Sequence, residues 1–474
     1  MSTCSKAERD EVTHTDTWGL TMNGNPDEIS LHNKLVDDYL MLSPGLPQTM
    51  ESASLSEAPL TKCLLAQLVL MANTADTTTA AVTLVSRMDS RSLNSRERMH
   101  LQAVVRQASG DTKGASHVLD NLVRSLPFDV AALRLLHFSL FNQGRITDML
   151  SSIDEARQHW SAELPRKSLL DGMYSFALCE SGRFASAEQF GREAVSKTPN
   201  DLWSVHSVAH VFEMQGRWDS GVRWIRGSDD ALQGGSSFSG HVWWHLALYL
   251  LECGRHDQAL ALFDDLVYPI PSIEGLALSN AVALLCRLEF VCVDVGARWE
   301  RLTEGVSHRL GHHTQPFNDC HYAYALGRLG KTDKLADLLT GMAKWAEGNA
   351  GGHAGEVIRQ CGLAVAKGMG ALGQGRNEVA RSHLADANHS WWRLGGSAAQ
   401  RDLFTQALLR AEIHCRTDQS NDLAAARVKA RPKSPQAKIW EAFAVEATGG
   451  DGSSAKAEAI ALGWEADSDL KSPT

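Results

Sequence analysis

Two histidines and one glutamate fall on a single face of an expected helix in the segment DLWSVHSVAHVFEMQGR. His206, His210 and Glu213 occupy positions i, i+4 and i+7, and at about 100° per residue these positions form one narrow stripe. Imidazole and carboxylate groups side by side suit proton transfer, because their coupling moves both pKa values towards neutrality. The segment therefore indicates acid/base chemistry.

Two later segments repeat this arrangement. In HVWWHLALYLLECGR, His245, Tyr249 and Glu252 again occupy positions i, i+4 and i+7. In FNDCHYAYALGRLG, His321 follows Asp319 and stands nine residues before a glycine, as His245 does in its own segment. A single histidine on a helix is often only a core or surface group, but the recurrence in separate segments favours a shared site. We interpret these histidines, both glutamates and Asp319 as catalytic residues of that site.

Metal binding is the alternative role for the histidines. Two histidines at i and i+4 with a nearby carboxylate form half of a feasible divalent-metal site. If a metal is present, the expected ligands are His206, His210 and His245. The segments lack the H-E-x-x-H arrangement of zinc proteases, so the prediction is a site without a cofactor.

Five further residues are interpreted as substrate contacts. An arginine inside an apolar helix, such as Arg287 in ALLCRLEF, normally pairs with a carboxylate of the protein or of a ligand. The loop GGSAAQRD, which contains Arg401, would close over the cavity. Tryptophans in such a chain are more often packing residues than ligand contacts. The remaining three candidates are Tyr249, Trp203 and Trp244.

Glycines recur at steps of 34 or 38 residues through the middle of the chain, and the last step, of 76 residues, is twice 38. Each follows one amphipathic segment and precedes another, at the place where a helix C-terminus favours glycine. A period of about 34 residues is typical of tetratricopeptide repeat (TPR) helix–turn–helix units, which stack because one hairpin alone cannot bury its apolar face. We predict an all-α superhelix, a solenoid of degenerate TPR-like helical hairpins. The glycines are Gly110, Gly144, Gly182, Gly216, Gly254 and Gly330.

The chain is expected to divide into three parts. Residues 1–60 contain four prolines and read as an N-terminal arm with one or two helices. Residues 61–345 are the repeat array that carries the His/Glu site. The glycine-rich stretch AEGNAGGHAGEV interrupts the array, and residues 346–474 continue it with C-terminal helical repeats.

Composition excludes several classes of protein. The 474 residues carry a net charge of −10, which argues against nucleic acid as a partner. No apolar stretch is long enough to span a membrane, and the N-terminus lacks a signal-peptide layout, so a cytoplasmic protein is expected. The nine cysteines contain no C-x-x-C pair and read as reduced core residues. Cys320, beside an aspartate and a histidine, is the one candidate nucleophile.

Several stretches resemble the tetratricopeptide repeat protein 38 family, among them PFDVAALRLLHFSLFNQG, DLWSVHSVAHVFEMQGRWDSG and HVWWHLALYLLECGRHDQALALFDD. The pattern H-x3-H-x2-E-M-x-G-R followed by W-W-H-L-A-L is the most specific part, and the likeness spans roughly residues 15 to 420. The resemblance implies a soluble all-α protein of degenerate repeats, without a defined activity or agreed catalytic residues. Both ends of the chain depart from the pattern.

Two functions follow as hypotheses. The first is an enzyme that acts on a small polar, carboxylate-bearing molecule in an internal pocket, by a lyase, isomerase or hydrolase step in a biosynthetic pathway. The second is a scaffold whose concave groove binds a peptide or partner protein, as TPR arrays often do. The histidine, glutamate and tryptophan side chains favour the enzyme, because peptide grooves of this type usually display Asn, Lys and Arg. A homodimer is compatible with either hypothesis.

Overall fold

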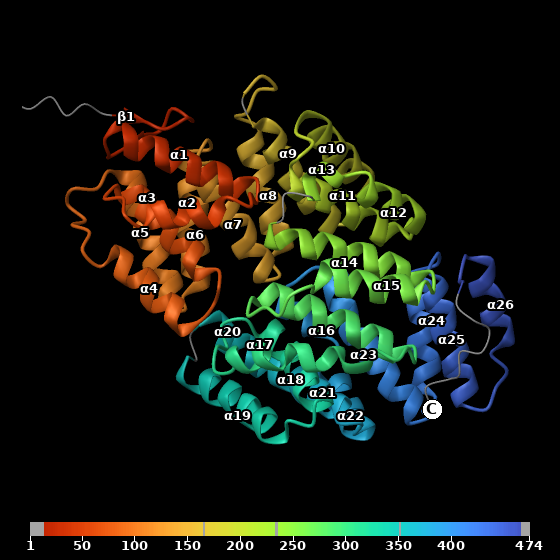
Figure 1. Cartoon of the computed structure of the whole chain (residues 1–474). Helices are drawn as coiled ribbons and strands as arrows, with labels where there is room; N and C mark the ends of the chain where they lie inside the picture. The colour runs from red at the N-terminus through yellow and green to blue at the C-terminus, as the bar shows by residue number, and fades with distance from the viewer. Residues whose placement is uncertain (1–13, 165, 233–235, 350–351, 466–474) are drawn as a thin grey trace, which may run out of the picture.

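The computed structural model describes residues 14–164, 166–232, 236–349 and 352–465. Within these residues the regular secondary structure is almost wholly helical, which confirms the all-α prediction (Figure 1). The one exception is a minimal antiparallel ladder of two-residue strands, β1 (His14–Thr15) and β2 (Thr21–Met22). None of the described helices is long and apolar enough to cross a bilayer.

The first helices of the chain form the red and orange part of Figure 1. Proline begins several of them, because its fixed φ suits the first helical position. The expected boundary at residue 60 falls inside α3, so the N-terminal arm runs directly into the array. These helices are α1 (Pro26–Leu40), α2 (Leu46–Ala53), α3 (Pro59–Leu70), α4 (Ala75–Val85), α5 (Ser95–Ala108), α6 (Thr112–Ser125), α7 (Val130–Asn142) and α8 (Ile146–Arg157).

The middle of the chain continues the hairpins. Its first helices pack on one another from one repeat to the next, and most of their residues are buried. The elements are α9 (Lys167–Glu180), α10 (Phe184–Lys197), α11 (Leu202–Gln215), α12 (Trp218–Arg226), α13 (Asp229–Leu232), α14 (Ser237–Glu252), α15 (His256–Leu262), the π-helix η1 (Phe263–Val267), α16 (Gly275–Phe290), the 3-10 helix η2 (Gly296–Leu302), α17 (Thr303–His308), α18 (Pro316–Arg328) and α19 (Thr332–Gly348).

The described residues of the last part of the chain form seven α-helices, of which Ala398–His414 is the longest. Because α19 continues to Gly348, the expected boundary at residue 345 also falls inside a helix. The elements are α20 (His353–Val357), the π-helix η3 (Ile358–Gly362), α21 (Leu363–Gly373), α22 (Asn377–Ala387), the 3-10 helix η4 (Trp391–Leu394), α23 (Ala398–His414), α24 (Gln419–Ala430), α25 (Pro435–Ala447) and α26 (Ser453–Ala461).

The six repeat glycines all turn the chain between the two helices of a hairpin. Their φ angles lie between 64° and 82°, the left-handed region that glycine adopts without steric cost. Gly296 has the same kind of conformation, with a φ of 56°, but the helix after it is replaced by η2 and α17. This substitution explains the double step between Gly254 and Gly330.

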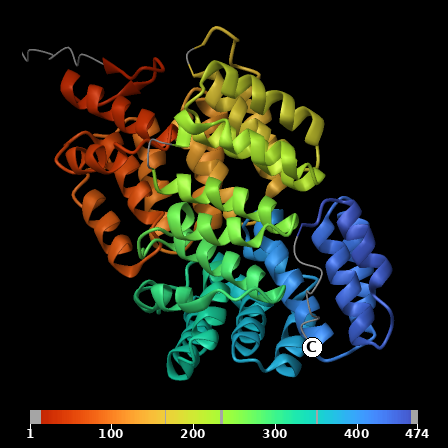
Figure 2. The same cartoon turned by 45° about the vertical axis from the view of Figure 1, so that its right-hand side comes forward.

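The two halves of the array touch, so the superhelix closes on itself. The Nη1 of Arg309 donates to the carbonyl oxygen of Ala72 at 2.7 Å, and the backbone N–H of Ala75 donates to Nδ1 of His312 at 3.0 Å. The end of the chain returns to the middle, where Nε1 of Trp218 donates to the carbonyl oxygen of Lys433 at 3.0 Å. Figures 1 and 2 show the blue helices α24 to α26 beside the green ones.

Helix α23 covers the inner side of the array. It packs against α11, α16 and α21, all first helices of their hairpins. A capping box begins it, in which Ser397 and Gln400 accept each other's backbone N–H groups. Leu403, Phe404 and Ala407 then enter the main core with no exposed surface. The concave side of these central repeats is therefore occupied by the chain's own helix.

Candidate metal centre

Helices α11 and α14 each bring two histidines to one place. The side chain of Asp201 caps α11 by accepting the backbone N–H of Trp203 at 3.1 Å. His206 and His210 then lie on one face, and His241 and His245 repeat the same i, i+4 spacing on α14. All four side chains are buried.

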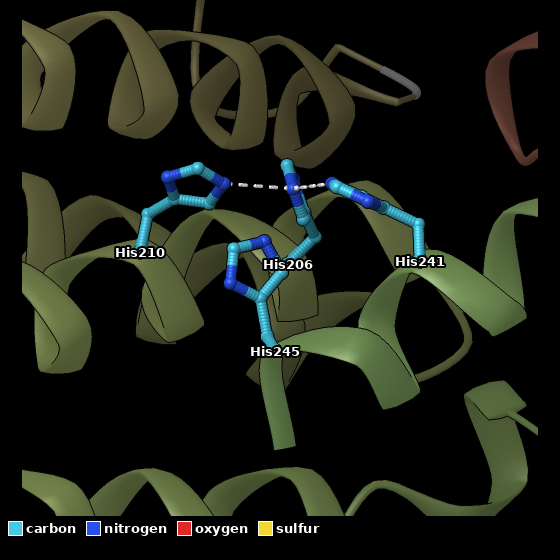
Figure 3. A group of neighbouring side chains, drawn as sticks. All are labelled: His206, His210, His241 and His245. Atoms are coloured by element: carbon cyan, nitrogen blue, oxygen red, sulfur yellow. Dashed lines mark hydrogen bonds between the residues drawn. The ribbon is translucent and has the colours of Figure 1, made fainter. Parts of the chain in front are cut away.

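The four rings converge on a common centre (Figure 3). One potential ligand atom from each ring lies within 4.8 Å of the others. The Nε2 of His206 is 2.9 Å from Nε2 of His210 and 3.1 Å from Nε2 of His241. The ring of His245 lies 4.4 Å, centroid to centroid, from that of His210. A cluster of buried imidazole nitrogens at these separations could hold a transition-metal ion.

The outer nitrogens of three of these rings face acceptors of the protein. The Nδ1 of His245 lies 2.9 Å from Oε2 of Glu213, and the Nδ1 of His241 lies 3.1 Å from Oδ1 of Asn280 on α16. The Nδ1 of His210 lies 3.3 Å from Oε1 of Glu180 at the end of α9, without hydrogen-bond geometry. Carboxylate and amide partners of this kind orient metal-binding histidines from outside.

These acceptors fix where the ring protons sit. A neutral imidazole carries one N–H, so an Nδ1 that donates to Glu213 or Asn280 leaves a lone pair on Nε2. The Nε2 of His206 faces the Nε2 atoms of both His210 and His241, and it can donate at most one proton to them. The Nε2 of His245 is buried and has no hydrogen-bond partner among the described residues. The centre therefore holds inward lone pairs with too few protons, which a cation would satisfy.

Burial keeps the rings in the form that binds metal. Loss of hydration lowers the pKa of His206, His241 and His245 well below the usual range, and the neighbouring histidines lower it further. The three rings are accordingly neutral near pH 7. Burial also raises the pKa of Glu213, against the attraction of Arg431 and His210. A cation at the centre would favour the ionised form of this carboxyl.

Aromatic side chains enclose the cluster. Three aromatic rings surround the ring of His206. The ring centroid of Phe176, which is stacked on it, lies 5.5 Å away, and the centroids of Trp203 and Phe238 each lie 5.0 Å away. Trp244 stacks on His241 at 5.4 Å. These contacts make a dry wall, which strengthens electrostatic interactions inside it. Both predicted tryptophans therefore belong to the shell of the cluster.

Glu252 does not lie at this cluster. Its carboxylate accepts a hydrogen bond from Ser434 and lies 3.5 Å from Nη1 of Arg431, near the start of α25. Burial raises its pKa, while Arg431 and Arg427 lower it. Tyr249 likewise uses its hydroxyl to donate to the carbonyl oxygen of Ala209 at 2.6 Å. The structure gives both residues partners that join neighbouring helices.

The residues around His321 form a separate group on α18. The Nδ1 of His321 lies 2.8 Å from the carbonyl oxygen of Phe317, and Asp319 lies 3.2 Å from Nδ1 of His313. The thiol of Cys320 is buried 3.6 Å from the carbonyl oxygen of Gly362, and burial raises its pKa well above the usual range. A thiol in this state is unsuited to nucleophilic attack.

The two predicted arginines are bound to backbone carbonyls. Nη1 of Arg287 donates to the carbonyl oxygen of Ala283 at 3.1 Å, and Nη2 to that of Ala399 at 2.9 Å, at the start of α23. Arg401 donates to the carbonyl oxygen of Gly396. The start of α23 also contacts a residue beside the histidine cluster. The N–H of Ala398 donates to Oε2 of Glu180 at 3.2 Å, and the other oxygen of Glu180 faces His210.

Three residues of the centre are absent from the sequence prediction: His241, Glu180 and Asn280. His241 had a usable signal, because it stands four residues before His245, as His206 does before His210. Glu180 and Asn280 had none, because they reach the cluster from α9 and α16, whose register against α11 and α14 is a property of the packing.

No family model matches the chain. Among solved structures, the chain is similar to a human IFIT1 dimer with m7Gppp-AAAA, at 14% identity and a TM-score of 0.39, over 95% of this chain and 97% of that one. A monomeric IFIT1 mutant with Gppp-AAAA gives 13% identity and a TM-score of 0.37, over 94% and 96%. At these TM-scores the likeness carries no argument about function.

Proposed function

We propose that this chain is a TPR-like helical repeat protein that binds one divalent transition-metal ion through His206, His210, His241 and His245. The proposal is carried by a single observation: four buried rings bring one nitrogen each to one centre, while Glu213 and Asn280 face the outer nitrogens of two of the rings. Three of these ligands coincide with the metal alternative drawn from the sequence. The proposal replaces the expectation of a site without a cofactor.

Charge and donor type support a divalent ion. Four neutral imidazoles contribute no charge, and the two outer carboxylates, Glu213 and Glu180, would balance two positive charges. Burying an ion without such compensation would be very costly. Imidazole ligands suit zinc, copper, iron and nickel, and four of them in tetrahedral geometry suit zinc best. We take Zn²⁺ as the ion to test first.

We infer that the ion acts as a brace inside a scaffold. Its ligands come in pairs from α11 and α14, so binding would tie two consecutive hairpins together. Four protein ligands are typical of structural zinc sites, whereas catalytic zinc usually has three and an open position. A peptide or protein partner would then dock outside the inner surface covered by α23. Cytoplasmic location, a homodimer and the exclusion of nucleic acid stay predictions.

The acid/base enzyme is the second candidate. The observation in its favour is the contact of 2.9 Å between Oε2 of Glu213 and Nδ1 of His245, a carboxyl and imidazole pair suited to proton transfer; burial raises the pKa of this carboxyl. A small substrate would have to reach the same Nε2 atoms as the metal. Membership of the tetratricopeptide repeat protein 38 family is likewise a proposal, supported by the quoted sequence stretches.

Metal analysis of the purified protein tests the main proposal. We expect one equivalent of zinc after purification without added metal, and retention of Co²⁺ with the intense visible bands of tetrahedral coordination after exchange. The double variant His210→Ala/His245→Ala should lose both, because it removes one ligand from each helix.

His321→Ala is the matched control for that variant. His321 is also buried on a first helix but bonds to a backbone carbonyl outside the cluster, so its replacement should leave the zinc content unchanged. Wild-type protein that binds neither zinc nor another transition metal, when refolded with each, would disprove the metal proposal. The acid/base enzyme would then be the hypothesis to test, by comparing the activity of wild type with that of the same double variant.

The carboxylate of Glu213 should tune the affinity of the histidine cluster for zinc. Glu213→Gln keeps the shape of the side chain but removes its charge and weakens the acceptor facing Nδ1 of His245. Loss of such a partner typically weakens metal binding by about 10- to 100-fold. Competition with a coloured zinc chelator would measure this, with Glu289→Gln, whose carboxylate pairs with Arg328, as the control. Equal affinity of Glu213→Gln and wild type would contradict this role.

A further inference from the structure

Three buried polar side chains lie near Trp203, outside the group of four histidines. Arg134 and His137 stand at i and i+3 on α7, and Tyr39 comes from α1, which packs against α7. Each is 1% exposed. Trp203 contacts His206 at 5.0 Å, while the Cζ of Arg134 lies 4.1 Å from the centroid of the Trp203 ring.

These side chains lack polar partners. Nε and Nη2 of Arg134, both ring nitrogens of His137 and the hydroxyl of Tyr39 have no hydrogen-bond partner among the residues that the structure describes. Arg134 forms no ion pair within the described part of the chain, and its guanidinium instead faces the rings of Phe138 and Trp203. A buried donor without an acceptor costs stability, and a buried charge without a partner costs more.

The other buried arginines have polar partners, which are backbone carbonyl oxygens for Arg287 and Arg309 and carboxylates for two more. Arg96 binds Asp16 and Asp129, each at 2.7 Å, and Arg427 binds Asp402. The carboxylate of Asp201 influences Arg134 through its charge, but it accepts from Ser204 and from the backbone of α11 and lies beyond ion-pair distance. Arg134 is therefore a buried cation with no anion within ion-pair distance in the described ranges of the chain.

The two unpaired donors of Arg134 form one edge of the guanidinium. Nε and Nη2 present parallel N–H groups, which match the two oxygens of a carboxylate or two oxygens of a phosphate. The same edge is used elsewhere in this protein, where Nε of Arg298 lies 3.2 Å from Oδ1 and Nη2 lies 2.6 Å from Oδ2 of Asp264. The free edge has the geometry for a bidentate oxyanion.

We propose that Arg134, His137 and Tyr39 form a binding site for a small oxyanion, either a carboxylate or a phosphate group. The guanidinium edge holds two oxygens of the anion, and the Tyr39 hydroxyl and one N–H of His137 complete the donors. Burial lowers the pKa of Arg134 to about 10, so the side chain is still charged at neutral pH. The site stands independently of the metal proposal.

Thermal unfolding and calorimetry with simple anions test this site. Sodium acetate, sodium oxalate and inorganic phosphate are compared with sodium chloride at equal ionic strength. We expect one class of oxyanion to raise the unfolding midpoint of wild type above the midpoint in chloride, and to give saturable heat of binding in calorimetry. Comparison of the carboxylate salts with phosphate identifies the class. Arg134→Met should abolish the midpoint shift and weaken binding at least tenfold.

The stability of this variant and two control variants make the result specific. Arg134→Met removes an unpaired buried charge, so its midpoint in chloride should be no lower than that of wild type, and a lost anion response then reports lost binding rather than misfolding. Arg91→Met, at a surface arginine paired with Asp89, should retain the anion response. His210→Ala/His245→Ala should retain it too, because that variant tests the metal site alone. No response of wild type to any of the anions, or an undiminished response of Arg134→Met, would overturn the proposal.

Discussion

Removing the metal with a chelator should lower the unfolding midpoint of the wild-type protein, and adding Zn²⁺ back should restore it. A ligand that binds only the folded state stabilises it by about 4 kcal/mol when its free concentration is a thousand times its Kd. Each tenfold increase in free Zn²⁺ should add about 1.4 kcal/mol while the site is saturated. Thermal unfolding followed by fluorescence, in buffers that fix the free Zn²⁺ concentration, measures how the midpoint depends on zinc.

Hydrogen exchange would locate the effect. Amides of α11 and α14 should lose most protection on chelation, because these helices supply all four ligands. His206→Leu is the informative variant, because it removes the ring that faces two other Nε2 atoms. Its midpoint should no longer depend on zinc. A wild-type midpoint that is the same in chelator and in zinc would rule out the bracing role.

Replacing Arg427 with methionine should destabilise the protein strongly without affecting the metal. Nη2 of Arg427 donates to Oδ2 of Asp402 at 2.9 Å, and the guanidinium also lies 4.0 Å from Glu252. Attraction by Arg427 and Arg431 outweighs burial and holds the pKa of Asp402 well below its usual range. Removing one partner of a buried ion pair costs about 3–5 kcal/mol.

Zinc content and chemical denaturation together check this expectation. The variant should unfold at lower urea concentration than wild type and keep its full equivalent of zinc, because Arg427 lies outside the four-histidine cluster. Lys429→Met, a substitution on the exposed side of the same helix, serves as the control. If Arg427→Met lost zinc in proportion to stability, the network at Glu252 would belong to the metal centre after all.

Local patterns in the sequence predicted the fold well. The repeat glycines mark hairpin turns because a left-handed residue is needed there whatever the neighbouring repeats do. The i, i+4 spacing of His206 and His210 was similarly sufficient to place both rings together. Both inferences depend only on the geometry of a single helix or turn.

The rest of the site depended on how helices meet. Counting from the glycines aligned His245 approximately with His206, whereas the packing pairs His206 with His241 and His210 with His245, each 35 residues apart. The glycine count fails because α14 has 16 residues and α11 has 14. Glu252, at the far end of α14, meets the returning C-terminal helices instead, a contact that no local pattern encodes.

The closure of the array by its own late segments changes how the protein must fold. An open solenoid can grow repeat by repeat, since each unit touches only its neighbours. Here α16 gains contacts to α23, and α14 to α25, only after more than a hundred further residues have been synthesised. During translation the apolar inner faces of the central repeats therefore remain uncovered, and the nascent chain has a long interval in which chaperones would be needed.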